Sequence, residues 1–286
     1  GYANGREGHE REMSDMGIVR RIGILGIGAL GGAVAQGLLQ KGISVSVFDT
    51  DETKKKHFAS LGAEIGKNAE ELCSGCDILC IAIKPNIFFQ VLSPLRNVLA
   101  GKLCISLAGG VSLEALVNAL PEIRWGRAMT NICAAVNRAF TGYVLPDNAT
   151  GEETDFLETA FGTLGEAIPL PEHLFNAITA ISGSGPAFFF SFLESFLLGG
   201  VRLGLPSALA LKAASWTAAG SAELLLRSGK HPAVLRDEVS TPGGTTIEGI
   251  TALLEGGVPA SIVRCLTKTA EKSGAMSGKG AGKSVD

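Results

Sequence analysis

Between residues 21 and 165, short apolar runs alternate with segments whose apolar positions repeat at helical spacing. The apolar runs are of strand length and are bounded by Gly, Pro or charged residues, which is typical of strands buried on both faces of a parallel sheet. This βαβ alternation predicts a doubly wound α/β domain. The expected strands are 22–26, 45–49, 78–83 and 103–107, and the expected helices are 29–41, 52–60, 68–74, 86–99 and 112–120.

After Pro169-Leu170-Pro171 only helical patterns follow, so we expect a second domain that is all α. The helix expected over 186–203 is apolar nearly all round, a pattern that belongs in a bundle core or between subunits. The other expected helices are 173–181, 206–228, 231–239, 245–256 and 259–274. We expect a disordered arm at 1–18, a dinucleotide-binding domain at 19–170, a helical domain at 171–276 and a disordered tail at 277–286.

The amino-acid composition indicates that the protein forms an oligomer. Hydrophobic residues make up 46% of the chain and mean hydropathy is +0.28, which is high for a soluble protein of 286 residues. The most apolar stretch, Ala187–Val201, is interrupted by Glu194 and is too short for a membrane span. Burial between subunits is therefore the expected explanation. A net charge of −3, with no Lys/Arg run that approaches a polybasic arm, disfavours nucleic acid as a partner.

The six cysteines show no regular spacing apart from Cys73-Ser74-Gly75-Cys76, and no secretory signal is evident. We expect a reducing, cytoplasmic location. Nothing completes a four-ligand zinc site with Cys73 and Cys76, so no metal is expected. Cys80 and Cys104 fall in expected strands and are interpreted as small core residues.

A Gly-x-Gly-x-x-Gly motif closes the first expected strand and opens a helix. On its own this motif is weak evidence, because glycine fills 38 of the 286 positions and a packing turn has the same sequence. Its context favours dinucleotide binding, with the pyrophosphate at the helix N-terminus. The candidate cofactor residues here are Gly26, Gly28, Ala29, Leu30 and Gly31.

Asp49 follows eighteen residues after Gly31, at the end of the second expected strand. Its carboxylate would accept hydrogen bonds from the adenosine ribose and repel a 2′-phosphate, which favours NADH. The alternative is that Thr50, Thr53 and Lys54–Lys56 hold a phosphate while Asp49 turns away. A solvated helix face explains the lysines equally well.

Two further strand ends carry candidate cofactor residues, because open α/β sheets bind ligands at the carboxyl edge. They are Ala82, Ile83, Lys84 and Pro85 after one strand, and Ala108 and Gly109 after the next. Lys84 could equally be an ordinary surface lysine.

Hydroxyl-rich turns precede two helices of the second domain, at 182–186 and 240–246. The second turn suits a carboxylate held by helix N-terminal amides, although an ordinary capped turn would look the same. All four histidines lie outside these motifs. A site with hydroxyls and no histidine suits reduction of an imine better than reduction of a ketone.

The sequence resembles the pyrroline-5-carboxylate reductase family over roughly 21–276. The resemblance is most specific over Asp237–Glu248, near the family's C-terminal signature, and over Ile181–Ala187. It implies an N-terminal Rossmann domain, a C-terminal helical domain that interlocks with a partner subunit in dimers or decamers, and reduction of a cyclic imine to L-proline with NADPH or NADH.

The resemblance also implies roles for individual residues. Thr246 matches the threonine whose hydroxyl contacts the imine nitrogen, and Asn131 falls beside the cofactor. The candidate substrate-carboxylate residues are Thr241, Gly243, Gly244 and Thr245, together with Ser184.

Two departures from the family leave alternatives open. The family typically has Asn-Thr-Pro where this chain has Asn131-Ile132-Cys133, which would suit a different cyclic imine. Many members carry a small hydroxyl residue in place of Asp49 and favour NADPH. A catalytically silent dinucleotide sensor is a further alternative, and the retained Thr246 argues against it. A β-hydroxyacid dehydrogenase would need a lysine that Ala187–Phe196 does not contain.

Overall fold

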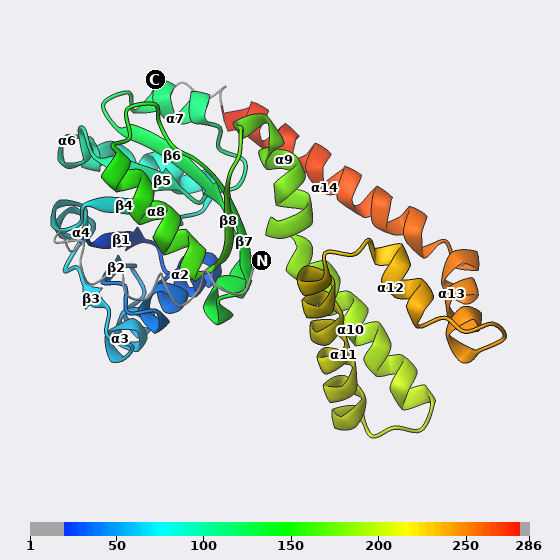
Figure 1. Cartoon of the computed structure of the whole chain (residues 1–286). Coiled ribbons are helices and arrows are strands. Elements are labelled where there is room, and N and C mark those ends of the chain that lie inside the picture. The colour runs from blue at the N-terminus through cyan, green and yellow to red at the C-terminus, as the bar shows by residue number, and fades with distance from the viewer. Residues whose placement is uncertain (1–19, 281–286) are drawn as a thin grey trace. The chain divides into compact units, whose positions relative to one another are not determined.

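The computed structural model describes residues 20–280, in two compact units (Figure 1). The first unit runs to Gly183 and takes up the chain again from Lys272, and the second is Ser184–Glu271. The expected arm at 1–18 and the last residues of the expected tail, 281–286, lie outside the described residues.

The first unit is built on an eight-stranded sheet in the order β3-β2-β1-β4-β5-β6-β7-β8. The strands from β3 to β6 are parallel, β7 is antiparallel to β6, and β8 is parallel to β7. Chain order reverses between β1 and β4, as in doubly wound folds. The strands are β1 (Ile22–Leu25), β2 (Val45–Phe48), β3 (Glu64–Ile65), β4 (Ile78–Ile81), β5 (Leu103–Ser106), β6 (Arg124–Met129), β7 (Ala139–Val144) and β8 (Gly165–Pro169).

Helices cover both faces of this sheet. Alternate strand residues enter different cores: Ile78 and Cys80 pack with α2 and α8, whereas Leu79 and Ile81 pack with the helices of the other face. The first core is covered by α2 (Ala29–Gln40) and α8 (Gly151–Thr163), and the second by α4 (Ala69–Gly75), α5 (Phe88–Leu92), α6 (Arg96–Leu99) and α7 (Leu113–Ala119). The short helix α3 (Glu52–Ser60) follows β2. Cys80 and Cys104 are fully buried, as the sequence predicts.

The helix expected over 86–99 is broken into short pieces. The 3₁₀ turns Pro85–Ile87 and Ser93–Leu95 flank α5 and separate it from α6. Pro94 has no amide hydrogen to continue the helical bonding, which explains the second break. The helix expected over 173–181 is likewise a 3₁₀ turn (Glu172–Leu174), α9 (Phe175–Ile178) and a π-helical turn (Thr179–Gly183).

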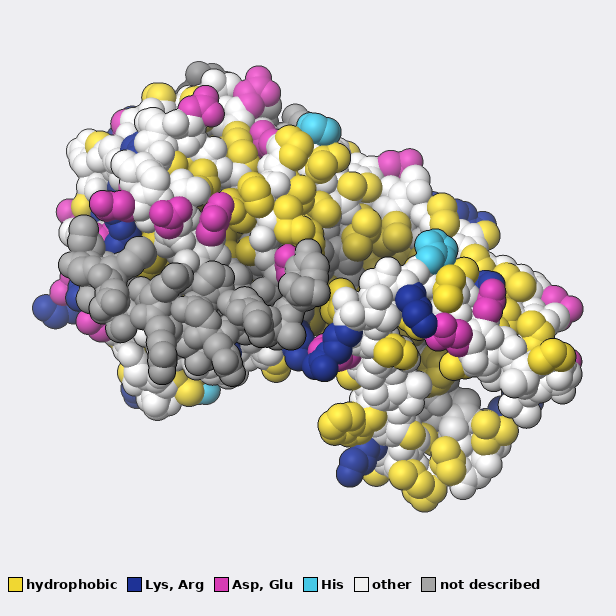
Figure 2. Space-filling model, in the orientation of Figure 1, with side chains coloured by type: hydrophobic (Ala, Val, Ile, Leu, Met, Phe, Trp, Pro, Cys, Tyr) yellow, Lys and Arg dark blue, Asp and Glu magenta, His cyan; other side chains and the backbone are white. Residues whose placement is uncertain are grey.

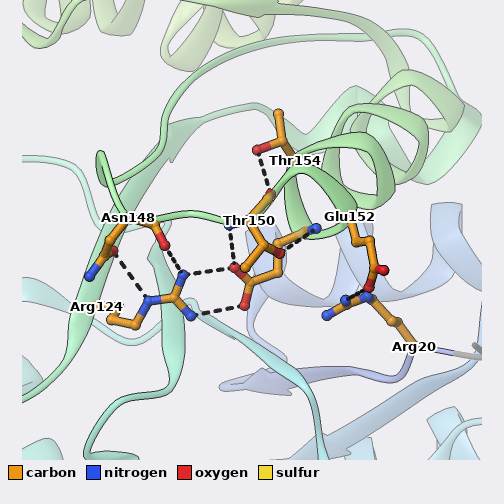
Figure 3. A network of polar contacts seen from close by, with 7 residues as sticks. Arg20, Arg124, Asn148, Thr150, Glu152 and Thr154 are labelled. Carbon is orange, nitrogen blue, oxygen red and sulfur yellow. Dashed lines mark hydrogen bonds and ion pairs between the residues drawn. The ribbon is translucent and has the colours of Figure 1, made fainter.

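The strands β3, β6, β7 and β8 and the helix α8 are absent from the sequence expectation. Charged residues interrupt the apolar pattern of β6, and the fold supplies them with distant partners. Arg124 forms a bidentate contact with Glu153 of α8, at 2.9 and 2.7 Å (Figure 3). Arg127, which is 5% exposed, pairs with Glu172 and lies 4.9 Å from the ring centroid of Phe175.

The second unit consists of helices. α10 (Gly185–Arg202) and α11 (Ser207–Ser228) form a hairpin whose backbones approach closely, since a Cβ at Gly200 would lie 2.7 Å from that of Ala210. α12 (Pro232–Glu238), α13 (Thr245–Glu255) and the first part of α14 (Val258–Gly280) follow. α14 extends to Gly280, beyond the expected end at 274. Near that expected end, Ser273 is buried and hydrogen-bonds Asn176.

Many large apolar side chains of the second unit are exposed (Figure 2). Phe189 and Phe196 on α10 are 67% and 64% exposed, and Trp216 on α11 is 74% exposed. By length and composition alone, Glu172–Arg202 is apolar enough to cross a membrane, and α13 with α14 would pass the same test as a bent pair.

Candidate active site

The glycine motif forms a tight turn between β1 and α2. Gly26 has φ +91°, a conformation that L side chains rarely adopt, and its amide donates to the Phe48 carbonyl at 2.8 Å. Gly31 packs directly against the Gly26 carbonyl and Ala82, leaving no space for a Cβ, whereas the space beside Gly28 is open. As the N-cap of α2, Gly28 has no side chain to occupy the first amides of the helix. The turn can therefore hold an anionic pyrophosphate.

Asp49 faces this turn from the end of β2. One carboxylate oxygen accepts from the Ile27 amide at 2.9 Å, and the other accepts from the Asp51 amide at 3.0 Å. The side chain is only 14% exposed, and the Lys54 ammonium lies 3.8 Å from it. The structure thus brings Asp49 into contact with the glycine motif at Ile27, 22 residues earlier in the chain, and leaves Thr50 exposed.

Some residues of the alternative phosphate site have contacts within α3, whereas the side chains of Thr50, Thr53 and Lys56 are exposed. Asp51 caps α3 by accepting from the amides of Thr53 and Lys54 at 2.9 and 3.3 Å. Lys55 pairs with Glu52 at 2.5 Å and lies over the Phe48 ring. The first amides of α3 thus already bond the Asp51 carboxylate.

The carboxyl ends of β1, β4, β5 and β6 meet at one edge of the sheet. Ala82 continues the pairing, with its amide donating to the Leu25 carbonyl at 2.9 Å, and Ala108 is buried after β5. Ile83 and Gly109 are half-buried, and Lys84 and Pro85 are exposed. The predicted candidates after β4 and β5 therefore share this edge, beside the strand-order reversal where such sheets bind ligands.

Asn131 stands at the same edge, two residues after β6. Its amide nitrogen donates to the Ser182 hydroxyl at 3.0 Å, and its oxygen accepts from the Cys133 amide at 2.9 Å. Beside it, the buried hydroxyls of Thr141 and Thr130 hydrogen-bond at 2.8 Å. Ser182 is a site residue that its sequence does not single out from Ser184, because the two serines share one hydroxyl-rich turn at 182–186.

The candidate substrate residues lie in the second unit. Gly243 has φ +65°, and the Gly244 amide donates to the Thr241 carbonyl at 3.0 Å, which forms a turn in front of α13. Gly244 is the N-cap of α13 and has no side chain to occupy the first amides of the helix, so they can serve a carboxylate. Thr246 is half-buried in the first turn of α13. Ser184 is the N-cap of α10.

No group of three or more metal-ligating side chains is found within residues 20–280. Burial raises the pKa of the Cys73 thiol to about 12, and burial likewise raises the pKa of Cys76. Thiols held protonated in this way are weak nucleophiles and weak ligands.

Comparison with known proteins decides the family. Residues 172–276 match a family model described as pyrroline-5-carboxylate reductase dimerisation, and residues 21–110 match one described as NADP oxidoreductase coenzyme F420-dependent. The pyrroline-5-carboxylate reductase of Methanosarcina acetivorans is 37% identical over 261 residues, covering 89% of this chain and 97% of that protein. That of Escherichia coli is 35% identical over 266 residues, covering 90% and 98%.

The chain belongs to the pyrroline-5-carboxylate reductase family. Solved structures agree: a Plasmodium falciparum pyrroline carboxylate reductase with NADP bound superimposes with a TM-score of 0.83 at 27% identity, covering 90% of this chain and 98% of that one. A 1-pyrroline-5-carboxylate reductase from Streptococcus pyogenes gives 0.80 at 28% identity, with the same coverage. The predicted family, fold class and oxidoreductase class are confirmed, and a nicotinamide dinucleotide is the cofactor of this family fold.

Proposed function

We propose that this protein reduces 1-pyrroline-5-carboxylate to L-proline. The observation that carries the proposal is the match to reductases of this name along about nine-tenths of the chain. Hydride passes from C4 of the reduced nicotinamide to the imine carbon, the C=N bond becomes a single bond, and the nitrogen takes up one proton. Alignment of the two rings supplies most of the rate enhancement, because the cofactor carries the chemistry.

The second unit provides the groups that this substrate needs. The α13 amides, with Thr241, Gly243, Gly244 and Thr245, hold the substrate carboxylate, and Ser184 adds a hydroxyl at the start of α10. The Thr246 hydroxyl hydrogen-bonds the imine nitrogen and relays a solvent proton to it, taking up one proton from water as it gives one to the nitrogen. This role needs no histidine, in keeping with His231 serving as a helix cap through its bond from the Ala233 amide.

The first unit holds the dinucleotide. The pyrophosphate lies at Gly26–Gly31 and the N-terminus of α2, and the nicotinamide end follows the sheet edge at Ala82–Pro85, Ala108–Gly109 and Asn131. Two carboxylates stand at the ribose end, Asp49 at the glycine turn and Asp51 on α3. Because both would repel a 2′-phosphate, we propose NADH as the preferred cofactor.

Further proposals concern assembly and location. The exposed apolar side chains of α10 and α11 support a homodimer through the helical unit, and the dimerisation model matched at 172–276 points the same way. We propose that the dimer acts in the cytoplasm, with neither a membrane nor nucleic acid as a partner, and that it can assemble into a decamer.

The experiment that tests the proposed substrate compares kcat/KM for 1-pyrroline-5-carboxylate with that for the six-membered cyclic imine carrying the same carboxylate. We expect a preference for the five-membered ring of at least tenfold, the order expected for one methylene in a fitted pocket. A preference for the larger ring would instead support the second candidate, a reductase of another cyclic imine. The altered Asn131-Ile132-Cys133 segment favours that candidate.

A further inference from the structure

A short chain of buried polar groups links three segments of the first unit. The Asn131 amide nitrogen donates to the Ser182 hydroxyl, and that hydroxyl donates to the Phe140 carbonyl, both at 3.0 Å. Asn131 and Ser182 are 8% and 7% exposed. The bonds join the end of β6, the π-helical turn and the start of β7.

These bonds fix the orientation of the Asn131 carboxamide. The Cys133 backbone amide is only a donor, so it must face the Asn131 oxygen, which lies 2.9 Å away. The amide nitrogen is thereby turned toward Ser182. A serine hydroxyl can accept that N–H and donate its own hydrogen to Phe140 at the same time, which an alanine or a valine cannot do. Within the described residues, the Asn131 amide nitrogen makes no second hydrogen bond.

The Asn131 carboxamide lies where a ligand of this fold would bind. Asn131 lies at the sheet edge where doubly wound folds bind their ligands. The π-helical turn packs closely under it, since a Cβ at Gly183 would lie 3.1 Å from the Met129 sulfur. Single π-helical turns are frequent at functional sites, because they turn a side chain out of ordinary helical register.

We propose that Ser182 is a positioning residue that holds the Asn131 carboxamide toward the nicotinamide end of the dinucleotide. The remaining N–H of Asn131 then meets a hydrogen-bond acceptor of the cofactor, such as the carboxamide oxygen of nicotinamide. This inference rests on the proposed function for the placement of the cofactor at Asn131. It adds a residue outside the set that the sequence analysis selects.

The test uses the full-length protein and NADH as the probe, with binding followed by nucleotide fluorescence. We expect Ser182→Ala to weaken NADH binding about tenfold, the order of one lost hydrogen bond, and to raise the KM for the imine much less. Ser182→Thr keeps the hydroxyl and should restore most of the affinity.

Ser273→Ala is the matched control. It removes another serine–asparagine bond of the same unit, to Asn176 at 2.8 Å, from a serine that is also 7% exposed. A purely structural role for Ser182 would lower the melting temperature of both alanine variants and leave NADH binding unchanged in both. That result would overturn the proposal.

A double-mutant cycle decides whether Ser182 acts through Asn131. Once Asn131→Ala has removed the carboxamide, adding Ser182→Ala should weaken NADH binding no further. Additive losses would overturn the proposal. Because NADH binding is measured without substrate, a wild-type protein that binds NADH but leaves 1-pyrroline-5-carboxylate unreduced would contradict the proposed reaction and still allow this test.

Discussion

At the scale of single residues, Thr246 carries the clearest prediction. Thr246→Ala should lower kcat about 100-fold, because it removes the hydroxyl that contacts the imine nitrogen, while the Kd for NADH stays nearly constant. Steady-state kinetics with 1-pyrroline-5-carboxylate measures the effect. The control is Thr251→Ala on the same helix, where the hydroxyl bonds the Ile247 carbonyl at 2.9 Å. Equal kcat values for the two variants would remove Thr246 from the mechanism.

Asp49 gives a second prediction at this scale. Asp49→Ser should shift the ratio of kcat/KM for NADPH to that for NADH upward by roughly tenfold, because a carboxylate beside a 2′-phosphate is repulsive. Asp49→Asn keeps an acceptor for the Ile27 amide but removes the negative charge. It therefore distinguishes an effect of the charge from an effect of a changed turn conformation. Glu52→Gln, which removes a nearby charge from α3, serves as the control. An unchanged ratio in both Asp49 variants would place the ribose elsewhere.

Residues that act through their neighbours are the hardest to predict from sequence. The glycine motif and Asp49 are predictable because their spacing follows from local chain geometry. Ser182 is not, because its importance depends on Asn131 and Phe140, which are 51 and 42 residues away in the chain. Nothing in an apolar helical pattern indicates a π-helical turn.

At the scale of elements, the contact between β6 and α8 depends on charge. The Arg124 guanidinium lowers the pKa of the Glu153 carboxyl to about 2, and Glu153 also caps α8 through the Thr150 amide (Figure 3). A folded-state pKa below the unfolded value of about 4.3 stabilises the fold above that pH. The stabilisation, on the order of 2 kcal/mol, is lost as the pH falls from about 5 toward 2.

Glu153→Gln should therefore lower the free energy of unfolding at pH 7 and weaken its decline toward pH 3. Denaturant unfolding at the two pH values measures this. Glu152→Gln is the matched control, since that side chain is 70% exposed and pairs with Arg20 on the surface (Figure 3). An equal acid dependence in wild type and Glu153→Gln would show that the Arg124 contact does not stabilise the fold.

Contacts of this kind explain why β6 cannot be predicted from the sequence while other strands can. Strands β1, β2, β4 and β5 are short, mainly apolar runs that are almost wholly buried, so each is visible locally. In β6 the charged residues Arg124 and Arg127 pair with Glu153 and Glu172, which lie 29 and 45 residues further along the chain. A pattern that depends on such distant partners cannot be recognised in a short window.

At the scale of the whole molecule, exposed apolar helices require a partner. Phe189 and Phe196 lie two turns apart on α10, hence on one face of it. Replacing both by Glu should convert a dimer into a monomer of 29.5 kDa, because the charges would have to be buried without partners. Analytical ultracentrifugation measures the mass.

Val117→Glu, an exposed apolar position on α7, is the control and should leave the dimer intact. A wild-type protein that sediments as a monomer would contradict the proposed assembly. A wild-type protein that requires lipid or detergent to remain dispersed would instead support membrane insertion of these helices.

The proposed reaction is tested by following both of its products at once. Purified protein is incubated with 1-pyrroline-5-carboxylate and either NADH or NADPH, and the oxidised cofactor and L-proline are quantified together. We expect one L-proline to form per cofactor oxidised, the oxidation to depend on the imine, and turnover to be faster with NADH. Binding of cofactor without formation of L-proline would contradict it.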